Sequence, residues 1–352
     1  MQTPSFVMYT EVLNKNLTKI QQIEKEAKVK ILHTVKSFNH PYVLPLIGSA
    51  LSGMSVGNIR ELEMAQKAKA EEIHLYAPAY KNFELKKIIN QVNTISFNSL
   101  NQFNLFKNLS DTTSMGLRIN PKLHLPIPYH CNPNEYRSRL GVDYIEFLEA
   151  FQKTPAHFNK LSGLHFHSLF QSSEVGTTIL LDHILEHYQT ILPKLKWINL
   201  GGGHLFTSDN FNVNNFIKAV NNFQLLYPKI QLSFEPGEAV TKGCGEFVTT
   251  VLDIIHIAGE NVAILDTSTE THLLDVAIVN QRLKVKNTQS NSTPYFYELT
   301  GNSCLQGDII GEYFFTHPLK IGDQVIFEDM MGYTMVKMTK FNGIKEALFI
   351  LK

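Results

Sequence analysis

The sequence of 352 residues contains no apolar run that approaches the roughly 20 residues of a membrane-spanning helix. Cysteine is scarce, and its three residues are far apart and form no CxxC pair: Cys131, Cys244 and Cys304. We expect free thiols in a reducing compartment, not a disulfide framework. The first eleven residues have neither the basic start nor the apolar stretch of a signal peptide. The sequence therefore predicts a soluble, cytoplasmic protein.

An excess of charge of either sign is also lacking. Lys and Arg together number 32, Asp and Glu together number 32, and the net charge is zero. A protein whose main partner is nucleic acid usually carries a basic surface, so we expect no such partner. Hydrophobic residues make up 43% of the chain, which is enough for a sizeable core. The length fits one large barrel with a smaller domain, or two domains.

A regular alternation of short apolar runs and helical segments extends to about residue 236. Apolar strands that alternate with helices indicate a parallel sheet covered by helices. Eight such units predict a closed, TIM-like (β/α)₈ barrel, which we place at residues 10–238. The expected strands are 30–35, 50–56, 72–77, 94–97, 115–120, 161–167, 196–200 and 231–234, and the helices include 11–27, 58–70, 83–90, 143–152, 176–192 and 211–227.

After Pro236 the pattern changes to strands joined by turns, with few helical stretches. This predicts a second, mostly β domain at residues 239–352, which the short N-terminal segment 1–9 would join through a strand near Phe6. The fold class is thus α/β, a barrel followed by a β domain. The expected strands of the second domain are 247–257, 262–265, 282–286, 295–298, 324–327 and 333–338.

Three consecutive glycines, Gly201, Gly202 and Gly203, end the apolar run that begins at Trp197. Glycine is used where the backbone passes close to another group or takes a positive φ. Exposed N–H groups at such a turn bind anions, most often a phosphate. The alternative is a flexible turn between a strand and a helix, and both interpretations remain open on these residues alone.

Unusual residues follow five of the expected barrel strands. Chemistry in a (β/α)₈ barrel takes place at the carboxyl ends of the strands, so these residues should meet at one rim. They lie at the ends of these strands: Lys36 at the first, Arg118 at the fifth, His165 and His167 at the sixth, Gly201–Gly203 at the seventh, and Glu235-Pro236-Gly237-Glu238 at the eighth.

Each of these side chains has a functional and a structural interpretation. Lys36 is either a nucleophilic amine in the barrel mouth or a solvated loop lysine. Glu235 either keeps the ring nitrogen of a pyridine protonated or forms a salt bridge with a barrel lysine or arginine. Arg118 could be the partner in that salt bridge, or it could bind a cofactor phosphate. His165 and His167 point to the same side of a strand, either as a metal pair or with one ring stacked on a cofactor.

Taken together, these motifs resemble the fold-type III pyridoxal-phosphate enzymes, the alanine racemase-like barrels that include ornithine and diaminopimelate decarboxylases. The resemblance covers nearly the whole chain. Within that group the chain is most similar to the carboxynorspermidine/carboxyspermidine decarboxylases. The segments that carry this closer similarity are Lys36-Ser37-Phe38, Gly163-Leu164-His165-Phe166-His167-Ser168, Glu235-Pro236-Gly237-Glu238-Ala239-Val240, Leu265-Asp266-Thr267-Ser268 and Gly301-Asn302-Ser303-Cys304-Leu305-Gln306-Gly307-Asp308.

The resemblance implies a role for each matching residue. Lys36 would carry the aldehyde of pyridoxal 5'-phosphate, His167 would stack on its ring, and Glu235 would pair with the ring nitrogen. The phosphate would be bound by backbone N–H groups of Gly201, Gly202, Gly203 and Gly237 and by Tyr333, with Arg118 as a further cofactor residue. No metal is implied.

Two further residues of the resemblance imply a homodimer with shared active sites. Cys304 matches a cysteine that the partner chain delivers close to the substrate's Cα, and Asp308 matches an acid of the same loop that helps to bind substrate. Two complete sites would then be built in each head-to-tail dimer. Either Cys304 or Lys36 would return the proton to Cα after CO₂ is lost.

One departure from the wider group concerns the substrate. Ornithine and diaminopimelate decarboxylases usually carry arginine where this chain has Glu238, and a carboxylate there attracts an amine and repels a second carboxylate. Asp275 is a second candidate for binding that amine, or else a turn or cap residue. Leu305 follows Cys304 where related enzymes place an acid, which argues against ornithine specificity.

The expected function is therefore pyridoxal-phosphate-dependent decarboxylation of carboxynorspermidine or carboxyspermidine in polyamine biosynthesis. Three alternatives remain. The first is a decarboxylase of the same group that acts on diaminopimelate, ornithine or arginine. The second is a non-catalytic pyridoxal-phosphate carrier, although such carriers lack the C-terminal β domain. The third is a metal-dependent hydrolase that uses His165 and His167.

Overall fold

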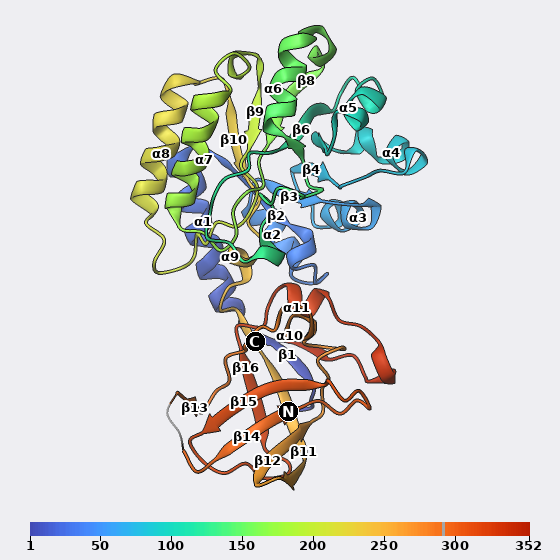
Figure 1. Ribbon diagram of the computed structural model, residues 1–352, viewed down its shortest axis with the longest axis vertical. Coiled ribbons are helices and arrows are strands. Elements are labelled where there is room, and N and C mark those ends of the chain that lie inside the picture. Colours follow the sequence, from blue (N-terminus) through green and yellow to red (C-terminus); the bar gives the residue numbers. More distant parts are fainter. Residues whose placement is uncertain (291–292) are drawn as a thin grey trace. The chain divides into compact units, whose positions relative to one another are not determined.

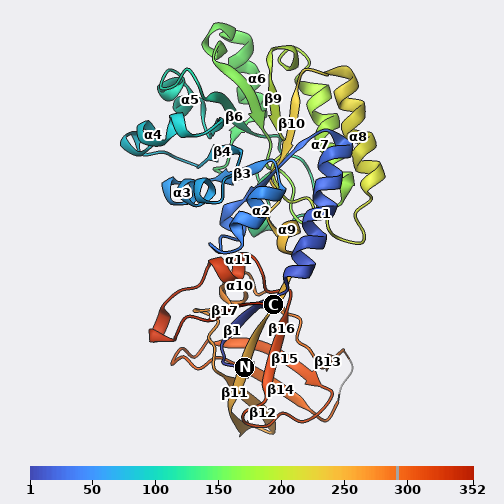
Figure 2. The ribbon, with the colours of Figure 1, turned by 180° about the vertical axis from the view of Figure 1, so that it is seen from behind.

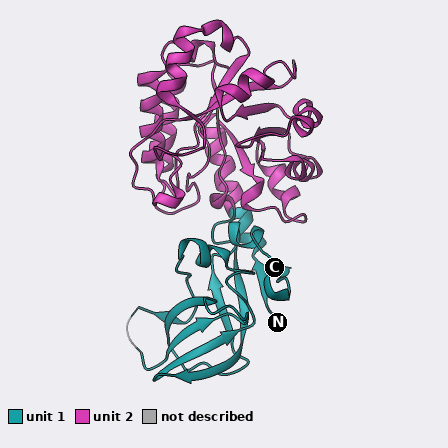
Figure 3. Ribbon diagram, turned by 45° about the vertical axis from the view of Figure 1, so that its right-hand side comes forward, with its two compact units in different colours: residues 1–15, 241–352 teal, residues 16–240 magenta. Residues whose placement is uncertain are grey.

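The computed structural model describes residues 1–290 and 293–352. The chain divides into two compact units, which Figure 3 shows in different colours. Residues 16–240 form the barrel unit, and residues 1–15 together with 241–352 form the sheet unit. No helix of the described residues combines the length and the apolar character needed to cross a membrane.

The barrel unit contains eight parallel strands that close on themselves, as predicted. Each strand pairs with the next barrel strand along the chain, and the first, β2, pairs with the last, β10. The two-residue strand β7 (Val142–Asp143) adds to the edge of β6. The barrel strands are β2 (Lys30–Thr34), β3 (Gly53–Val56), β4 (Glu72–Tyr76), β5 (Thr94–Phe97), β6 (Ser114–Asn120), β8 (Leu161–His165), β9 (Trp197–Asn199) and β10 (Gln231–Phe234).

Helices lie around the outside of this barrel, as both views of the ribbon show (Figures 1 and 2). The sequence predicted most of them, but it did not predict α2, α5 and α9; residue 50, expected in a strand, is the last residue of α2. The helices α2 and α5 are seven residues long and α9 is four, which is short for a clear helical period. The helices are α1 (Thr10–Ala27), α2 (Leu44–Ala50), α3 (Ile59–Lys67), α4 (Asn82–Ile88), α5 (Leu100–Phe106), α6 (Tyr144–Lys153), α7 (Glu174–His187), α8 (Val213–Leu226) and α9 (Glu238–Thr241).

Trp197 fills the interior of the barrel. A Cβ atom on Gly163 would lie 2.0 Å from its ring, and one on Gly116 would lie 2.4 Å from it, so the adjacent strand β8 and the next strand β6 both need glycine here. The indole N–H donates to Ser114 Oγ at 2.9 Å. Because side chains alternate along a strand, Asn199 on β9 and His165 on β8 face the same interior, nearer the carboxyl ends of the strands. The tryptophan thus forms a floor beneath the barrel mouth.

The sheet unit is built on a sheet with the order β13-β15-β14-β12-β11-β1-β17, with β16 paired to β11. The N-terminal strand β1 lies antiparallel to β11 and parallel to β17. The elements are β1 (Ser5–Met8), β11 (Gly245–Ile257), β12 (Glu260–Leu265), α10 (Leu274–Val279), β13 (Thr288–Gln289), β14 (Phe296–Thr300), β15 (Ile309–Phe315), β16 (Gln324–Glu328), α11 (Tyr333–Val336) and β17 (Leu348–Leu351).

Two strand predictions in the sheet unit are wrong. Residues 333–338 begin with the helix α11, because a helical turn brings Thr334 and Lys337 onto one face, from which both bind Asp275. Residues 282–286 form no strand, and only the single bridge from Val285 to Phe327 joins them to the sheet. The elements α10, β13, β15 and β17 were not predicted from the sequence.

Candidate active site

Lys36 and Glu235 follow the carboxyl ends of two adjacent parallel strands, β2 and β10. Lys36 lies in a short 3₁₀ turn, Val35–Ser37, directly after β2. Thr34 joins the two strand ends, because its hydroxyl donates to the Glu235 carbonyl at 2.8 Å and its N–H donates to the Pro236 carbonyl at 3.3 Å. The lysine and the acid are therefore at the same end of the barrel.

The Lys36 side chain is exposed in the open mouth, yet it is surrounded by protein atoms. Desolvation is the main cause that lowers its pKa, and the positive charge of Arg118 lowers it further. The negative charges of Glu235 and Glu61 act in the opposite direction and only partly offset these effects. The amine therefore loses its proton more readily than an ordinary lysine, which makes it a better nucleophile.

Glu235 is buried and bound by side chains from two other strands. Its Oε1 lies 2.5 Å from His74 Nδ1 on β4 and accepts a hydrogen bond from Asn199 Nδ2 at 2.7 Å. Burial would raise the pKa of this carboxyl, but electrostatic attraction to His74 and the hydrogen bonds from His74 and Asn199 hold it well below its usual range. The partner expected in a structural interpretation was Arg118; the partner found is His74.

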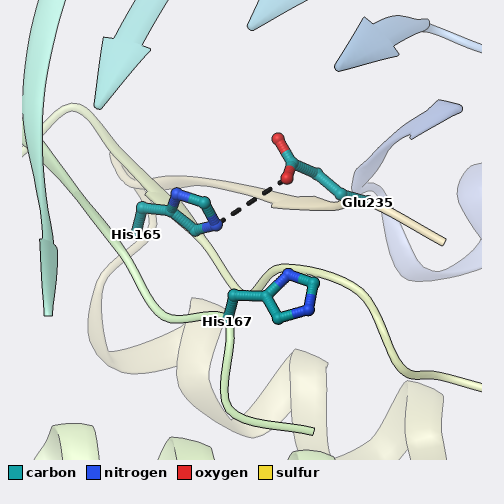
Figure 4. Close-up of side chains that lie close together, drawn as sticks. All are labelled: His165, His167 and Glu235. Carbon is teal, nitrogen blue, oxygen red and sulfur yellow. Dashed lines mark ion pairs between the residues drawn. The ribbon is translucent and has the colours of Figure 1, made fainter. Parts of the chain in front are cut away.

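His165 and His167 lie beside this carboxylate, as Figure 4 shows. His165 Nε2 is 3.7 Å from Glu235 Oε2, and neither ring nitrogen of His165 has a hydrogen-bond partner among the described residues. Desolvation lowers the pKa of both histidines well below the usual value, so both rings are neutral. One ligand atom from each of the three residues lies within 4.8 Å of the others, a spacing that could also hold a metal ion.

Arg118 is buried at the carboxyl end of β6. Its Nη2 donates to the His167 carbonyl at 3.2 Å, and its guanidinium lies 4.7 Å from the centre of the Tyr76 ring. Its Nε has no partner among the described residues. Arg118 therefore fixes the backbone of the segment that carries His167, and it retains one unused donor.

The glycine turn packs against the His167 segment and the Glu235 backbone. A Cβ atom on Gly201 would lie 2.6 Å from His167 Cα, one on Gly202 would lie 2.5 Å from the Glu235 carbonyl, and one on Gly203 would lie 2.2 Å from the Leu169 carbonyl. Gly201 and Gly203 also have positive φ angles, of 67° and 92°. No other residue fits here without a backbone shift.

The N–H groups of these glycines differ in what they bind. Gly201 donates to Asn199 Oδ1 at 2.8 Å, so its N–H is committed within the barrel and is not directed to an anion. Gly202 donates to His167 Nδ1 at 3.2 Å. For Gly203 and Gly237 the described residues supply no acceptor. The expected phosphate donors are thus reduced to Gly203 and Gly237, with Gly202 as a third if its bond to His167 opens.

Glu238 is the first residue of α9, three positions after Glu235. Gln171, in the loop after β8, donates its amide to both Glu238 oxygens, at 3.2 and 3.0 Å. Gln171 has a positive φ of 42° that directs this loop, and sequence reasoning missed it. A carboxylate oriented by Gln171 therefore follows the last barrel strand at its carboxyl end.

Asp275 lies on α10 in the sheet unit and is nearly buried. Its carboxylate forms an ion pair with Lys337 and accepts a hydrogen bond from the Thr334 hydroxyl at 3.2 Å. The Lys337 ammonium in turn lies 5.5 Å from the centre of the exposed Tyr333 ring. An incoming amine would have to displace or join Lys337 to reach Asp275.

Cys304 is exposed in the loop between β14 and β15, and its thiol is free. Asp308, four residues on, is buried and accepts four hydrogen bonds within the sheet unit. They come from the N–H and hydroxyl of Thr269, at 2.7 and 2.9 Å, and from the N–H and hydroxyl of Ser303, at 3.1 and 2.6 Å. Asp308 thereby shapes the loop that carries Cys304.

Sequence reasoning missed the residues inside the barrel that bind and orient the Glu235 carboxylate. His74 lies within the apolar run of β4, Asn199 ends β9, and Ser96 on β5 contacts His74 at 2.8 Å. The available signal was a polar residue at an inward-facing position of an otherwise apolar strand. These three side chains meet only because the barrel closes, and the sequence alone does not show which strand positions come together.

The residues present fit a pyridoxal phosphate. The mouth offers an amine with a lowered pKa, an ionised buried carboxylate, a neutral imidazole and N–H donors at a turn that tolerates only glycine. The unpaired ring nitrogens of His165 and the unpaired Nε of Arg118 are further polar atoms that face no protein partner in the described residues. Such a set can hold an anionic, electron-accepting aromatic aldehyde.

Comparison with known proteins gives the same answer. Residues 12–242 match the model of the pyridoxal-dependent decarboxylases, pyridoxal binding domain. A carboxynorspermidine/carboxyspermidine decarboxylase of Campylobacter jejuni is 34% identical and covers 98% of this chain and 91% of its own. A carboxyaminopropylagmatine decarboxylase of Synechocystis is also 34% identical, over 97% of this chain and 88% of its own.

A solved structure supports the fold in detail. The crystal structure of carboxynorspermidine decarboxylase from Campylobacter jejuni, complexed with norspermidine, superimposes with a TM-score of 0.91 at 33% identity. It covers all of this chain and 94% of that one. These matches leave no support for the carrier or the metal-dependent hydrolase. The protein is therefore an enzyme of the pyridoxal-dependent decarboxylase family, with the alanine racemase-like fold and pyridoxal 5'-phosphate as its cofactor.

Proposed function

We propose that the enzyme decarboxylates carboxynorspermidine and carboxyspermidine and so releases norspermidine and spermidine. The observation that carries this proposal is Glu238, an acid held by Gln171 at the barrel mouth, where related decarboxylases of shorter substrates usually have arginine. A carboxylate favours a substrate with a cationic far end. The full-length similarity to the Campylobacter enzyme supports the same substrate class.

Bound pyridoxal phosphate supplies an aldehyde that exchanges amines and a ring that accepts the electrons left when CO₂ departs. Lys36 would hold the cofactor through its side-chain amine. Glu235 would keep the ring nitrogen protonated through a carboxylate oxygen, and the neutral His167 ring would stack on the cofactor ring. Gly203, Gly237 and Tyr333 would bind the phosphate. Cys304 or Lys36 would return a proton to the substrate's Cα.

The distal amines of the substrate would be bound by acids. Glu238 is the main candidate, because it is an acid at the barrel mouth whose two carboxylate oxygens are oriented by the Gln171 amide. Asp275 is a second candidate that must first release Lys337. For Asp308 we propose a supporting role, since four hydrogen bonds already engage its carboxylate.

The proposal is tested by measuring CO₂ release from carboxynorspermidine, carboxyspermidine, diaminopimelate and ornithine, with and without added pyridoxal phosphate. We expect turnover of the first two and little of the others. Efficient turnover of diaminopimelate with none of the triamine precursors would overturn the proposed substrate class but not the family.

A second candidate substrate is carboxyaminopropylagmatine, because the Synechocystis enzyme is as similar to this chain as the Campylobacter enzyme is. The two candidates differ at the far end, where one has an amine and the other a guanidinium. Both are cationic, so Glu238 is compatible with either. The ratio of kcat/KM values for the two substrates, measured side by side, decides between them.

Glu238→Arg is expected to raise KM for the preferred substrate by about 10- to 100-fold, because a like charge replaces an attractive one. The affinity for pyridoxal phosphate should change far less. Glu238→Gln is the matched control, since it removes the charge but can still bond to Gln171; it should give an intermediate KM. Equal losses of substrate and cofactor binding in Glu238→Arg would show that Glu238 is structural.

We also propose that the enzyme is a homodimer in which the Cys304 loop of one protomer completes the barrel mouth of its partner. If so, Lys36→Ala and Cys304→Ala subunits each lack a different half of the site. Mixed after dissociation, they should regain roughly a quarter of wild-type activity, since half of the dimers are mixed and each has one intact site. No recovery, despite proven subunit exchange, would contradict shared sites.

The lowered pKa of Lys36 gives a pH prediction for the apo-protein. Only the neutral amine attacks an aldehyde, so the rate of pyridoxal phosphate capture should rise with pH around a midpoint below the ordinary lysine value of 10.5. Arg118→Met should move this midpoint upward by removing a neighbouring positive charge. Stopped-flow absorbance measures the rate. A midpoint at or above the ordinary value would contradict the desolvated environment of Lys36.

A cytoplasmic location remains a prediction. The cysteines form no disulfide with one another, and Cys304 is exposed, which is the state of thiols in a reducing compartment.

A further inference from the structure

We propose that His74 is a positioning residue for the cofactor: it holds Glu235 through Oε1 so that Oε2 faces the ring nitrogen of pyridoxal phosphate. This inference rests on the role proposed above for Glu235. It concerns a residue of β4 that contacts neither the lysine nor the glycine turn.

The two oxygens of Glu235 are used unequally. Oε1 contacts His74 Nδ1 at 2.5 Å and Asn199 Nδ2 at 2.7 Å, and these two nitrogens lie 2.5 Å from each other, so both donors converge on one oxygen. Oε2 has no hydrogen bond from any described residue. The closest recorded basic atom is His165 Nε2 at 3.7 Å, which is beyond hydrogen-bond distance. Oε2 is therefore the oxygen left to accept a new N–H group.

The His74 ring is itself held in place by a hydrogen bond and by neighbouring aromatic rings. It is 1% exposed, and its Nε2 shares a hydrogen bond with Ser96 Oγ at 2.8 Å. Its edge packs against the rings of His165, at 5.1 Å between centroids, and Trp197, at 5.7 Å. Contact with an ionised carboxylate requires that Nδ1 carries the proton. A rotated or flipped ring would lose its hydrogen bonds to Glu235 and Ser96.

The arrangement matters because the acid is buried. A carboxyl group without charged or hydrogen-bonding partners would take up a proton there and would no longer accept one from a ring nitrogen. The N–H of His74 offsets this cost by its hydrogen bond to Oε1, and the pKa of Glu235 is correspondingly lowered. Through Glu235, His74 should therefore keep the cofactor ring protonated, although it does not touch the cofactor.

The test compares binding of two cofactors by the apo-protein: pyridoxal phosphate and its 1-deaza analogue, in which the ring nitrogen is replaced by CH. Quenching of Trp197, the single tryptophan of the chain, measures both dissociation constants. Wild type should prefer pyridoxal phosphate by about 10- to 100-fold, the size of a hydrogen bond to a buried charge. His74→Leu should lose most of this preference while binding of the deaza analogue stays close to wild type.

A matched variant separates positioning from packing. His74→Asn has nearly the shape of His74→Leu, but its amide can donate to Glu235 from the position of Nδ1, so it should restore most of the preference. His183→Leu, which removes a half-buried histidine on α7, should leave the preference unchanged. If the Asn and Leu variants lose affinity for both cofactors equally, His74 only fills space and the inference is wrong.

Two further variants complete the test. Ser96→Ala is a smaller change that removes the hydrogen bond behind His74, and it should lower the preference if His74→Leu fails to fold; an unchanged preference would count against the inference. Glu235→Gln tests the role of Glu235 separately from the role of His74. If it leaves the preference intact, the role of Glu235 fails. If it abolishes the preference while His74→Leu does not, only the role of His74 fails.

Discussion

Lys36→Ala is expected to remove the visible absorption of the lysine-bound cofactor and to lower kcat by at least about 10³-fold. The reason is that no other described residue places an amine with a lowered pKa at the mouth end of β2. Without Lys36 the cofactor would be held only through its phosphate and ring. No lysine would then be present to displace the product from the cofactor at the end of the reaction. Absorbance spectra and CO₂ release measure the two effects.

The control for this variant is Lys67→Ala, which removes an exposed lysine from α3 outside the mouth and should change neither quantity. An added small primary amine should partly restore turnover to Lys36→Ala by replacing the missing side chain. A Lys36→Ala enzyme with an unaltered spectrum and near-normal turnover would end the mechanism proposed here.

Glu235→Gln is expected to lower kcat by about 100-fold or more while the protein stays folded. A glutamine can still accept the hydrogen bonds of His74 and Asn199 through its carbonyl oxygen, so the barrel should tolerate it. In place of Oε2, however, it presents an N–H group toward the ring nitrogen. That nitrogen would then lose its proton, and the ring would accept electrons poorly.

The readouts for Glu235→Gln are kcat, KM and thermal unfolding, measured together. The expected pattern is a large fall in kcat with little change in KM, because the acid acts on the cofactor and not on the substrate. A variant that unfolds at much lower temperature and loses KM and kcat together would assign Glu235 to stability. Unchanged kcat would remove the acid from the mechanism.

The barrel was predictable because its strands are short, apolar and regularly spaced, and eight alternating strand–helix units fit few other folds. The sheet unit was harder to predict from the sequence. Residues 333–338 alternate in the manner of a strand, yet Thr334 and Lys337 bind Asp275 from a helical turn, a contact that depends on tertiary structure. Residues 348–351 form a strand only because they pair with the N-terminal strand, more than 300 positions away.

The candidate site, too, could be predicted only in part from the sequence. Strand ends share a rim in any parallel barrel, so Lys36, Arg118 and Glu235 could be brought together from the sequence. The residues that orient Glu235 could not, since His74, Ser96 and Asn199 come from three separate strands and become neighbours only when the barrel closes. The commitment of the Gly201 N–H to Asn199 likewise depends on the conformation of the turn.

The most direct measurement is to find the residue that carries the cofactor. The holoenzyme is reduced with borohydride, which makes the bond between pyridoxal phosphate and its lysine permanent, and the digested protein is then analysed by mass spectrometry. We predict a single pyridoxyl group, on the peptide that contains Lys36. A label on any other lysine, or none in an active enzyme, would contradict the placement of the cofactor in the barrel mouth.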